Sequence, residues 1–307
     1  MKREEFTFDS RDGVTKIHAV RWLPDGEVKG VFQLIHGMAE HIDRYENVAE
    51  WFTQKGFVVT GDDHLGHGHT VVEGGTYGYF CKDDPATVVV RDVHRLKKIT
   101  QEAYPGVPYF ILGHSMGSFI MRNYMIKYGS GITGAIVCGT ATQPMPVINF
   151  GIFLSKLQTL IFGGKHPGVF INRLSFGDPK KIPAGHENDW LCTDPEVCKK
   201  FGEDKLCGFL FTVNGFYTMF SLIHRMQLPA NINKIPKNLP IRVIAGTDDS
   251  VGNYGKGVTA AYEAYKAAGL TDVELKLYEG LRHEILNEPV RFEIYQEIYD
   301  WMLQRIG

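Results

Sequence analysis

The sequence lacks several features that define whole classes of protein. Its N-terminus begins Met1-Lys2-Arg3-Glu4 and carries charges where a signal peptide has an apolar core, so we expect a mature, cytoplasmic chain. The five cysteines are scattered, odd in number and form no Cys-x-x-Cys pair. They indicate free thiols in a reducing compartment rather than a disulfide framework or a zinc site.

An excess of charge of one sign is also missing. The net charge is −2 and Lys and Arg do not cluster, so we expect no nucleic-acid partner. No Gly-x-Gly-x-x-Gly follows an expected strand and no P-loop occurs, which argues against nucleotide chemistry. His64, His67 and His69 follow Asp63, but the glycines between them favour a tight turn over converging metal ligands. We therefore expect neither a metal nor an organic cofactor.

Short apolar runs alternate with segments of helical spacing through most of the chain. We expect an opening hairpin from residues 4–9 and 16–22 and a last helix over 289–306. This alternation predicts an α/β fold with a mostly parallel central sheet and helices on both faces. The other expected strands are 31–35, 57–60, 109–112, 135–138, 241–245 and 274–278, and the other expected helices are 44–54, 88–104, 116–128 and 256–268.

The alternation stops after residue 139 and resumes at 240. Residues 140–239 hold no convincing buried strand and are rich in aromatic residues, Pro, Asn and Gly. We interpret 1–139 and 240–307 as the core, and 140–239 as an insertion over the carboxyl edge of the sheet, where ligands bind in open α/β sheets. Apolar stripes at 147–160 and 209–223 are more often core, but on such an insertion they can line an acyl tunnel or rest on a membrane.

The strongest functional motif is Gly113-His114-Ser115-Met116-Gly117. With 34 glycines in the chain, chance alone predicts roughly 0.1 occurrences of the pattern Gly-x-Ser-x-Gly. The motif follows one expected strand and begins a helix, as a nucleophile elbow requires, whereas a plain turn serine needs no such setting. A serine hydroxyl also needs a base and an anion site beside it. We therefore predict that Ser115 is a nucleophile.

The base and the acid are expected after Ser115 in the chain, at the ends of later strands. His283 stands in a loop after strand 274–278, whereas the other three later histidines lie in the insertion. Strand 241–245 ends in Asp248 and Asp249, and either can orient His283 through Nδ1–H while the other caps the turn. Spacing alone does not separate the two aspartates.

The oxyanion of an acyl-transfer intermediate needs two aimed N–H donors. One is expected from Met116, the residue after the nucleophile. The other is expected from the loop after strand 31–35, where we choose Met38 because Gly37 lets the backbone curl. On its own, that loop can also be an ordinary glycine turn.

Read in order, these segments resemble the signatures of one family, the monoglyceride lipase and lysophospholipase group of α/β hydrolases (serine aminopeptidase S33 type). The resemblance covers nearly the whole chain. Residues 36–41 with 44–45 are similar to HGxxEHxxRY, 63–68 to the DxxGHG turn, 113–117 to the GHSMG elbow, 246–249 to the GxxD acid loop and 280–284 to the GxxHE loop.

The resemblance implies an α/β-hydrolase fold whose cap is the insertion. It assigns the role of the triad acid to Asp249, at the last position of the acid loop, and supports Met38 and Met116 as oxyanion donors. It places Glu40 and Arg44 near the pocket for the leaving alcohol, such as glycerol. A plain structural alternative is that these two form a salt-bridged loop anchor with His41.

Two further assignments and one departure belong to the same resemblance. We also assign Gly37 and His114 to substrate binding. In the lipase itself, a second histidine three residues after the catalytic one helps to hold glycerol, and that position here is Leu286. This departure counts against monoacylglycerol itself as the substrate.

These observations predict a serine hydrolase that cleaves carboxylic esters of single-chain lipids through an acyl-enzyme. A short-chain carboxylesterase, a thioesterase or an acyltransferase can use the same residues. A ligand-binding protein on the same fold is the alternative from another class, although it needs no triad. The expected partners are a small ester or lipid substrate and, through the cap, a weakly bound membrane surface.

Overall fold

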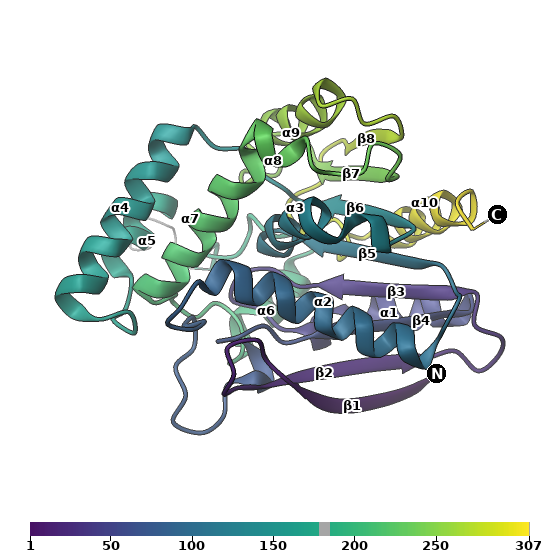
Figure 1. Cartoon of the computed structure of the whole chain (residues 1–307), viewed down its shortest axis with the longest axis horizontal. Coiled ribbons are helices and arrows are strands. Elements are labelled where there is room, and N and C mark those ends of the chain that lie inside the picture. Colours follow the sequence, from purple (N-terminus) through teal and green to yellow (C-terminus); the bar gives the residue numbers. More distant parts are fainter. Residues whose placement is uncertain (178–184, 307) are drawn as a thin grey trace.

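Eight strands form one sheet in the order β1-β2-β4-β3-β5-β6-β7-β8. The structure, a computed structural model, describes residues 1–177 and 185–306 (Figure 1). The strands are β1 Lys2–Asp9, β2 Lys16–Leu23, β3 Gly30–Ile35, β4 Phe57–Asp62, β5 Tyr109–His114, β6 Gly134–Cys138, β7 Ile241–Gly246 and β8 Val273–Tyr278. β2 pairs antiparallel with β1 and β4, and all other pairs are parallel. The predicted opening hairpin and mostly parallel sheet are therefore confirmed.

Alternate side chains of the central strands pack into two separate cores. In β3, Val31 and Ile35 join one buried core, while Phe32 and Leu34 join the other. Successive side chains of a strand point to opposite faces, so an almost wholly apolar strand must be covered on both faces. The continuous apolar runs in the sequence follow from this requirement.

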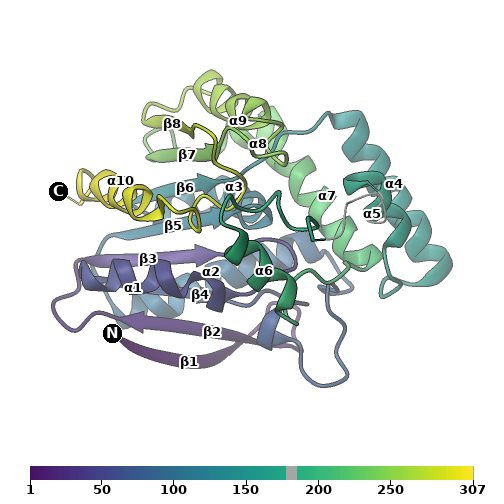
Figure 2. The ribbon, with the colours of Figure 1, turned by 180° about the vertical axis from the view of Figure 1, so that it is seen from behind.

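Helices cover both faces of the sheet. α1 Glu46–Gln54 and α10 Arg291–Leu303 pack on one face (Figure 2), and α2 Pro85–Ala103, α3 Met116–Tyr128 and α9 Lys256–Ala267 pack on the other (Figure 1). Three expected helices had boundaries that were wrong by a few residues. α2 begins at Pro85, which suits the first turn of a helix. A 3₁₀ turn, η1 Ile42–Tyr45, precedes α1, and α10 spans fewer residues than 289–306.

Helices also make up the described part of the segment between β6 and β7. They are α4 Met145–Phe162, α5 Val169–Phe176, α6 Pro195–Glu203, α7 Val213–Gln227 and α8 Pro229–Ile232. Within residues 139–177 and 185–240 the structure contains no named strand, as the sequence predicted, and only an isolated bridge joins Pro167 to Thr212. α7 is largely buried and contacts α3 and α4. Figure 1 shows α4 and α5 beyond α7, at the outer end of this segment.

Candidate active site

Ser115 lies in the sharp turn between β5 and α3, with φ 54° and ψ −122°. A side chain rarely adopts this backbone conformation, which costs on the order of 1–3 kcal/mol. The flanking glycines allow strand and helix to pass closely. A Cβ atom added at Gly113 would lie 2.3 Å from the Gly117 carbonyl oxygen, and one added at Gly117 would lie 2.1 Å from that of Ile35. The local geometry is therefore that of a nucleophile elbow.

His283 and Asp249 form a buried pair, and the ring centroid of His283 lies 4.7 Å from that of His114, the residue before Ser115. His283 Nδ1 lies 2.9 Å from Asp249 Oδ2, and the two residues are 2% and 0% exposed. Burial by itself raises the pKa of Asp249, but His283 and the backbone N–H groups of Val251 and Gly252 outweigh it and lower that pKa. The carboxylate is therefore ionised at neutral pH. His283 Nε2 is buried and has no hydrogen-bond partner among the described residues, so it is available to a reacting group.

Asp248 lies apart from this pair. Its side chain is exposed and accepts a hydrogen bond from Thr247 Oγ1 at 3.3 Å. Of the two aspartates that spacing left equivalent, the structure brings only Asp249 to His283.

The residues expected to form the oxyanion hole flank Ser115. A Cβ atom added at Gly37 would lie 3.1 Å from Ser115 Cβ, so the loop of residues 36–41 passes directly beside the serine. Met116 is the first residue of α3, where N–H groups lack intrahelical acceptors and the helix dipole is positive. Within the described residues, neither Met38 N–H nor Met116 N–H donates a hydrogen bond. Both donors are free for a ligand.

Glu40 holds the 36–41 loop in shape. Its carboxylate accepts hydrogen bonds from Gly37 N–H at 2.5 Å and Tyr45 Oη at 3.0 Å, and pairs with Arg44 Nη1 at 2.5 Å. Burial raises the pKa of Glu40, but Arg44 and then His114 bring it well below its usual range. The carboxylate therefore stays charged inside the protein, and it fixes the residue that precedes Met38.

The same carboxylate is linked to the loop that carries His283 by two routes. Arg44 makes two hydrogen bonds of 2.7 Å to Glu284, the neighbour of His283. The second route runs through His114. Its Nδ1 lies 3.5 Å from Glu40 Oε1, and its Nε2 lies 3.1 Å from the His283 carbonyl oxygen. Burial lowers the pKa of His114, but Glu40 outweighs it and raises that pKa. Glu40 and Arg44 thus make the contacts of a loop anchor, whereas His41 pairs with Asp204 instead. Contact of Gly37, Glu40, Arg44 or His114 with a substrate stays a prediction.

Replacing Arg44 by Met is expected to destabilise the protein by about 3–5 kcal/mol, because it leaves two buried carboxylates without their shared cation. For a chain of this size that is a fall in Tm of roughly 5–8 °C. Arg44→Met combined with Glu284→Gln removes one of the uncompensated charges and should be more stable than Arg44→Met alone. Thermal unfolding at pH 7 measures both. Equal Tm values for wild type and Arg44→Met would show that the network contributes nothing to stability.

Sequence reasoning missed two residues near the candidate base. Glu284 was recognised within a motif but was given no role, because its partner Arg44 lies 240 positions away. Trp190, from the segment between β6 and β7, has its ring centroid 5.2 Å from that of His283. No pattern in the sequence identifies it. Leu286, where the lipase signature has a histidine, is buried in an apolar core.

The Asp63 segment forms the expected tight turn. Asp63 Oδ1 accepts from Ile42 N–H at 2.8 Å, and Oδ2 accepts from His69 N–H at 2.8 Å and pairs with His18 Nδ1 at 2.9 Å. A Cβ atom at Gly68 would lie 2.3 Å from Asp63 Cγ. Both carboxylate oxygens of Asp63 are therefore engaged in contacts that stabilise this turn.

α4 presents a large apolar surface to solvent. Only 17% of its 18 residues are buried, and their mean hydropathy is 1.4, so among the described residues this one helix is long and apolar enough to cross a membrane. Length and composition alone are weak evidence for a membrane span. The exposed apolar side chains of α4 and α5 are Val147, Phe150, Phe153, Leu157, Leu160, Ile161, Phe162, Val169, Phe170, Leu174 and Phe176.

Known proteins resemble this chain over almost all of its length. The family described as "Serine aminopeptidase, S33" matches residues 26–290. A monoacylglycerol lipase of Mycolicibacterium smegmatis is 27% identical over 99% of this chain and 98% of its own length, and a human monoglyceride lipase is 26% identical over 92% and 86%. A thermostable carboxyl esterase from Bacillus coagulans, solved in complex with glycerol, has a TM-score of 0.92 and 32% identity over the whole of both chains.

Proposed function

The chain belongs to the serine aminopeptidase S33 family of α/β hydrolases, and from this premise we propose that it hydrolyses carboxylic esters through Ser115, His283 and Asp249. The observation that carries the proposal is the strained serine at the start of α3, together with the buried His283–Asp249 pair whose Nε2 is free. A structural serine needs neither the strained backbone nor a base with an open nitrogen.

The proposed reaction has two steps. Ser115 Oγ attacks the ester carbonyl carbon while His283 Nε2 takes its proton, and the imidazolium is stabilised by the Asp249 carboxylate. Collapse of the tetrahedral intermediate breaks the bond to the alcohol oxygen, which takes the proton from His283. Water, deprotonated by His283, then attacks the acyl-enzyme and releases the acid and free Ser115. The Met38 and Met116 N–H groups stabilise both oxyanions.

Glu40 and Arg44 act in this proposal through the backbone. The Glu40 carboxylate holds Gly37 N–H and thereby sets the position of Met38, while Arg44 connects it to the loop of His283. Their own polar atoms are already engaged, which favours a positioning role over direct contact with the alcohol.

For the substrate, we propose esters that carry a single medium or long acyl chain. The exposed apolar face of α4 and α5 supports this, since single-chain lipids are delivered from membranes or micelles. Residues 140–239 then act as the cap, and this face makes peripheral contact with lipid. The names of the lipase relatives support the same class of substrate. Because Leu286 replaces the histidine of the lipase signature, the identity of the alcohol that leaves is not proposed. The five free cysteines support a cytoplasmic location.

Hydrolysis of p-nitrophenyl esters from C2 to C16 tests the acyl preference. We expect kcat/KM to rise toward medium or long chains, since each buried CH₂ contributes up to about 0.8 kcal/mol. An optimum at C2 to C4 would contradict the lipid substrate and point to a short-chain esterase. Adding glycerol or another alcohol as a competing acceptor separates a hydrolase from an acyltransferase, because only the latter forms mostly ester product.

A further inference from the structure

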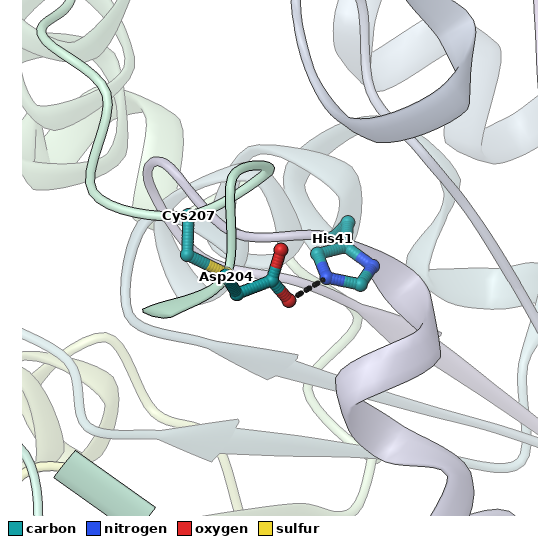
Figure 3. A group of neighbouring side chains, drawn as sticks. All are labelled: His41, Asp204 and Cys207. Carbon is teal, nitrogen blue, oxygen red and sulfur yellow. Dashed lines mark hydrogen bonds and ion pairs between the residues drawn. The ribbon is translucent and has the colours of Figure 1, made fainter. Parts of the chain in front are cut away.

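A second group of reactive side chains lies where the loop of residues 36–41 meets the segment after α6. His41 Nε2 lies 2.8 Å from Asp204 Oδ2. One ligand atom each from His41, Asp204 and Cys207 lies within 4.8 Å of the other two. In Figure 3 the Asp204 carboxylate is turned toward His41, and Cys207 approaches from the same loop as Asp204. We infer that these three residues form a binding site for a divalent transition metal, with Zn²⁺ as the best match.

The donor set selects the metal. Imidazole, carboxylate and thiolate are the ligands that Zn²⁺ takes in proteins, at about 2.0–2.3 Å, and three protein ligands leave a fourth position for water. Ca²⁺ and Mg²⁺ prefer oxygen ligands alone. Asp204 and Cys207 are separated by two residues, the spacing with which ligand pairs commonly reach one zinc ion. A bound thiolate and carboxylate together neutralise the charge of Zn²⁺.

The backbone presents Asp204 and Cys207 together. Cys207 N–H donates to the Asp204 carbonyl oxygen at 3.0 Å, and Leu206 N–H donates to Asp204 Oδ1 at 2.8 Å. This turn leaves Oδ2 as the carboxylate oxygen that faces His41. Tetrahedral ligation needs the three ligand atoms to lie about 3.5 Å from one another, so the proposed site requires their side chains to rotate inward when the metal binds.

The surroundings of His41 Nδ1 are consistent with metal binding through Nε2. His41 is 6% exposed, and its Nδ1 has no hydrogen-bond partner within the described residues, although Asp43 Oδ2 lies 4.0 Å away. Histidines that bind metal usually donate their other N–H to a carboxylate. When Nε2 binds a metal, the proton resides on Nδ1 and faces Asp43. Asp43 must approach from 4.0 Å to hydrogen-bond distance for the protonated Nδ1 to gain a partner.

The site joins two parts of the chain that are 163 positions apart. Gly208 N–H already donates to the Ala39 carbonyl oxygen at 2.9 Å, beside Met38. A metal bound to His41, Asp204 and Cys207 adds a stronger link between the same two loops. We therefore expect the metal to stabilise the folded protein by mass action.

Titration of the metal-free full-length protein with Co²⁺ and Zn²⁺ tests this site. We expect one equivalent of Co²⁺ to give a thiolate-to-cobalt charge-transfer band that Zn²⁺ abolishes, and Zn²⁺ to raise the Tm until a chelator is added. Cys207→Ser and Asp204→Asn should each lower the affinity by at least about 100-fold, since loss of an outer partner alone costs 10–100-fold. Cys81→Ser, which changes a free cysteine outside this group, should bind like wild type.

The site is refuted if wild type shows no thiolate–cobalt band, or if Cys207→Ser retains both the band and the rise in Tm. The second result would place the metal on other residues. None of these measurements uses ester hydrolysis, so the metal site and the proposed function can fail independently. Because Cys207 and Asp204 lie outside the proposed catalytic groups, the metal-free variants should hydrolyse esters as wild type does.

Discussion

Replacing Ser115 by Ala should lower kcat for ester hydrolysis by about 10⁶-fold, as removal of the nucleophile does in other triads. The reason is that water must then attack the ester directly, with only binding and the oxyanion donors left to help. Steady-state hydrolysis of the best p-nitrophenyl ester measures the loss. KM of the variant should approach the dissociation constant of the ester, because no acyl-enzyme accumulates without the serine hydroxyl.

The backbone of Ser115 provides the control for this variant. Ser115→Ala keeps the strain at φ 54°, whereas Ser115→Gly relieves it. Both variants should be inactive, and the glycine variant should be more stable than the alanine variant by on the order of 1 kcal/mol. A loss of activity that came from misfolding would instead lower the Tm of both. Activity within tenfold of wild type in Ser115→Ala would remove Ser115 from the mechanism.

Replacing Asp249 by Asn should lower kcat by about 10⁴-fold, because an amide favours the wrong tautomer of the histidine and does not stabilise its cation. Asp249 lies 2.9 Å from His283 Nδ1 and is wholly buried. Hydrolysis of the same ester, measured from pH 6 to 9, gives the effect on kcat.

Asp248→Asn is the matched control, since it makes the same chemical change one residue away. Asp248 is exposed and contacts Thr247 rather than His283, so its variant should stay within about twofold of wild type, as for an ordinary surface substitution. If Asp248→Asn lost activity and Asp249→Asn kept it, the pair seen in the structure would not be the catalytic one.

The order of strands and helices was predictable because local periodicity determines it. Strand β5, the turn at Ser115 and helix α3 are contiguous in sequence, and the glycines that the turn needs are two residues to either side. The sheet has two buried faces, so its strands stand out as apolar runs. For these reasons the candidate nucleophile and the expected positions of base and acid could all be proposed from the sequence.

Other features depend on contacts between distant segments and left no local signal. Asp248 and Asp249 are neighbours of the same residue type, and only the orientation of the turn after β7 exposes the first and buries the second. Arg44 and Glu284, like His41 and Asp204, are paired by the fold across more than half of the chain. The apolar pattern of α4 is the same whether the helix is buried or exposed, so its exposure also required the structure.

The role of Ser115 as nucleophile is tested most directly by the mass of the protein after reaction with a fluorophosphonate, which traps an activated serine. We expect one adduct per chain, located by peptide mapping at Ser115, with simultaneous loss of ester hydrolysis. We also expect no adduct in Ser115→Ala and much slower labelling in Asp249→Asn. An adduct on a different residue, or full hydrolytic activity in the labelled protein, would contradict Ser115 as the nucleophile.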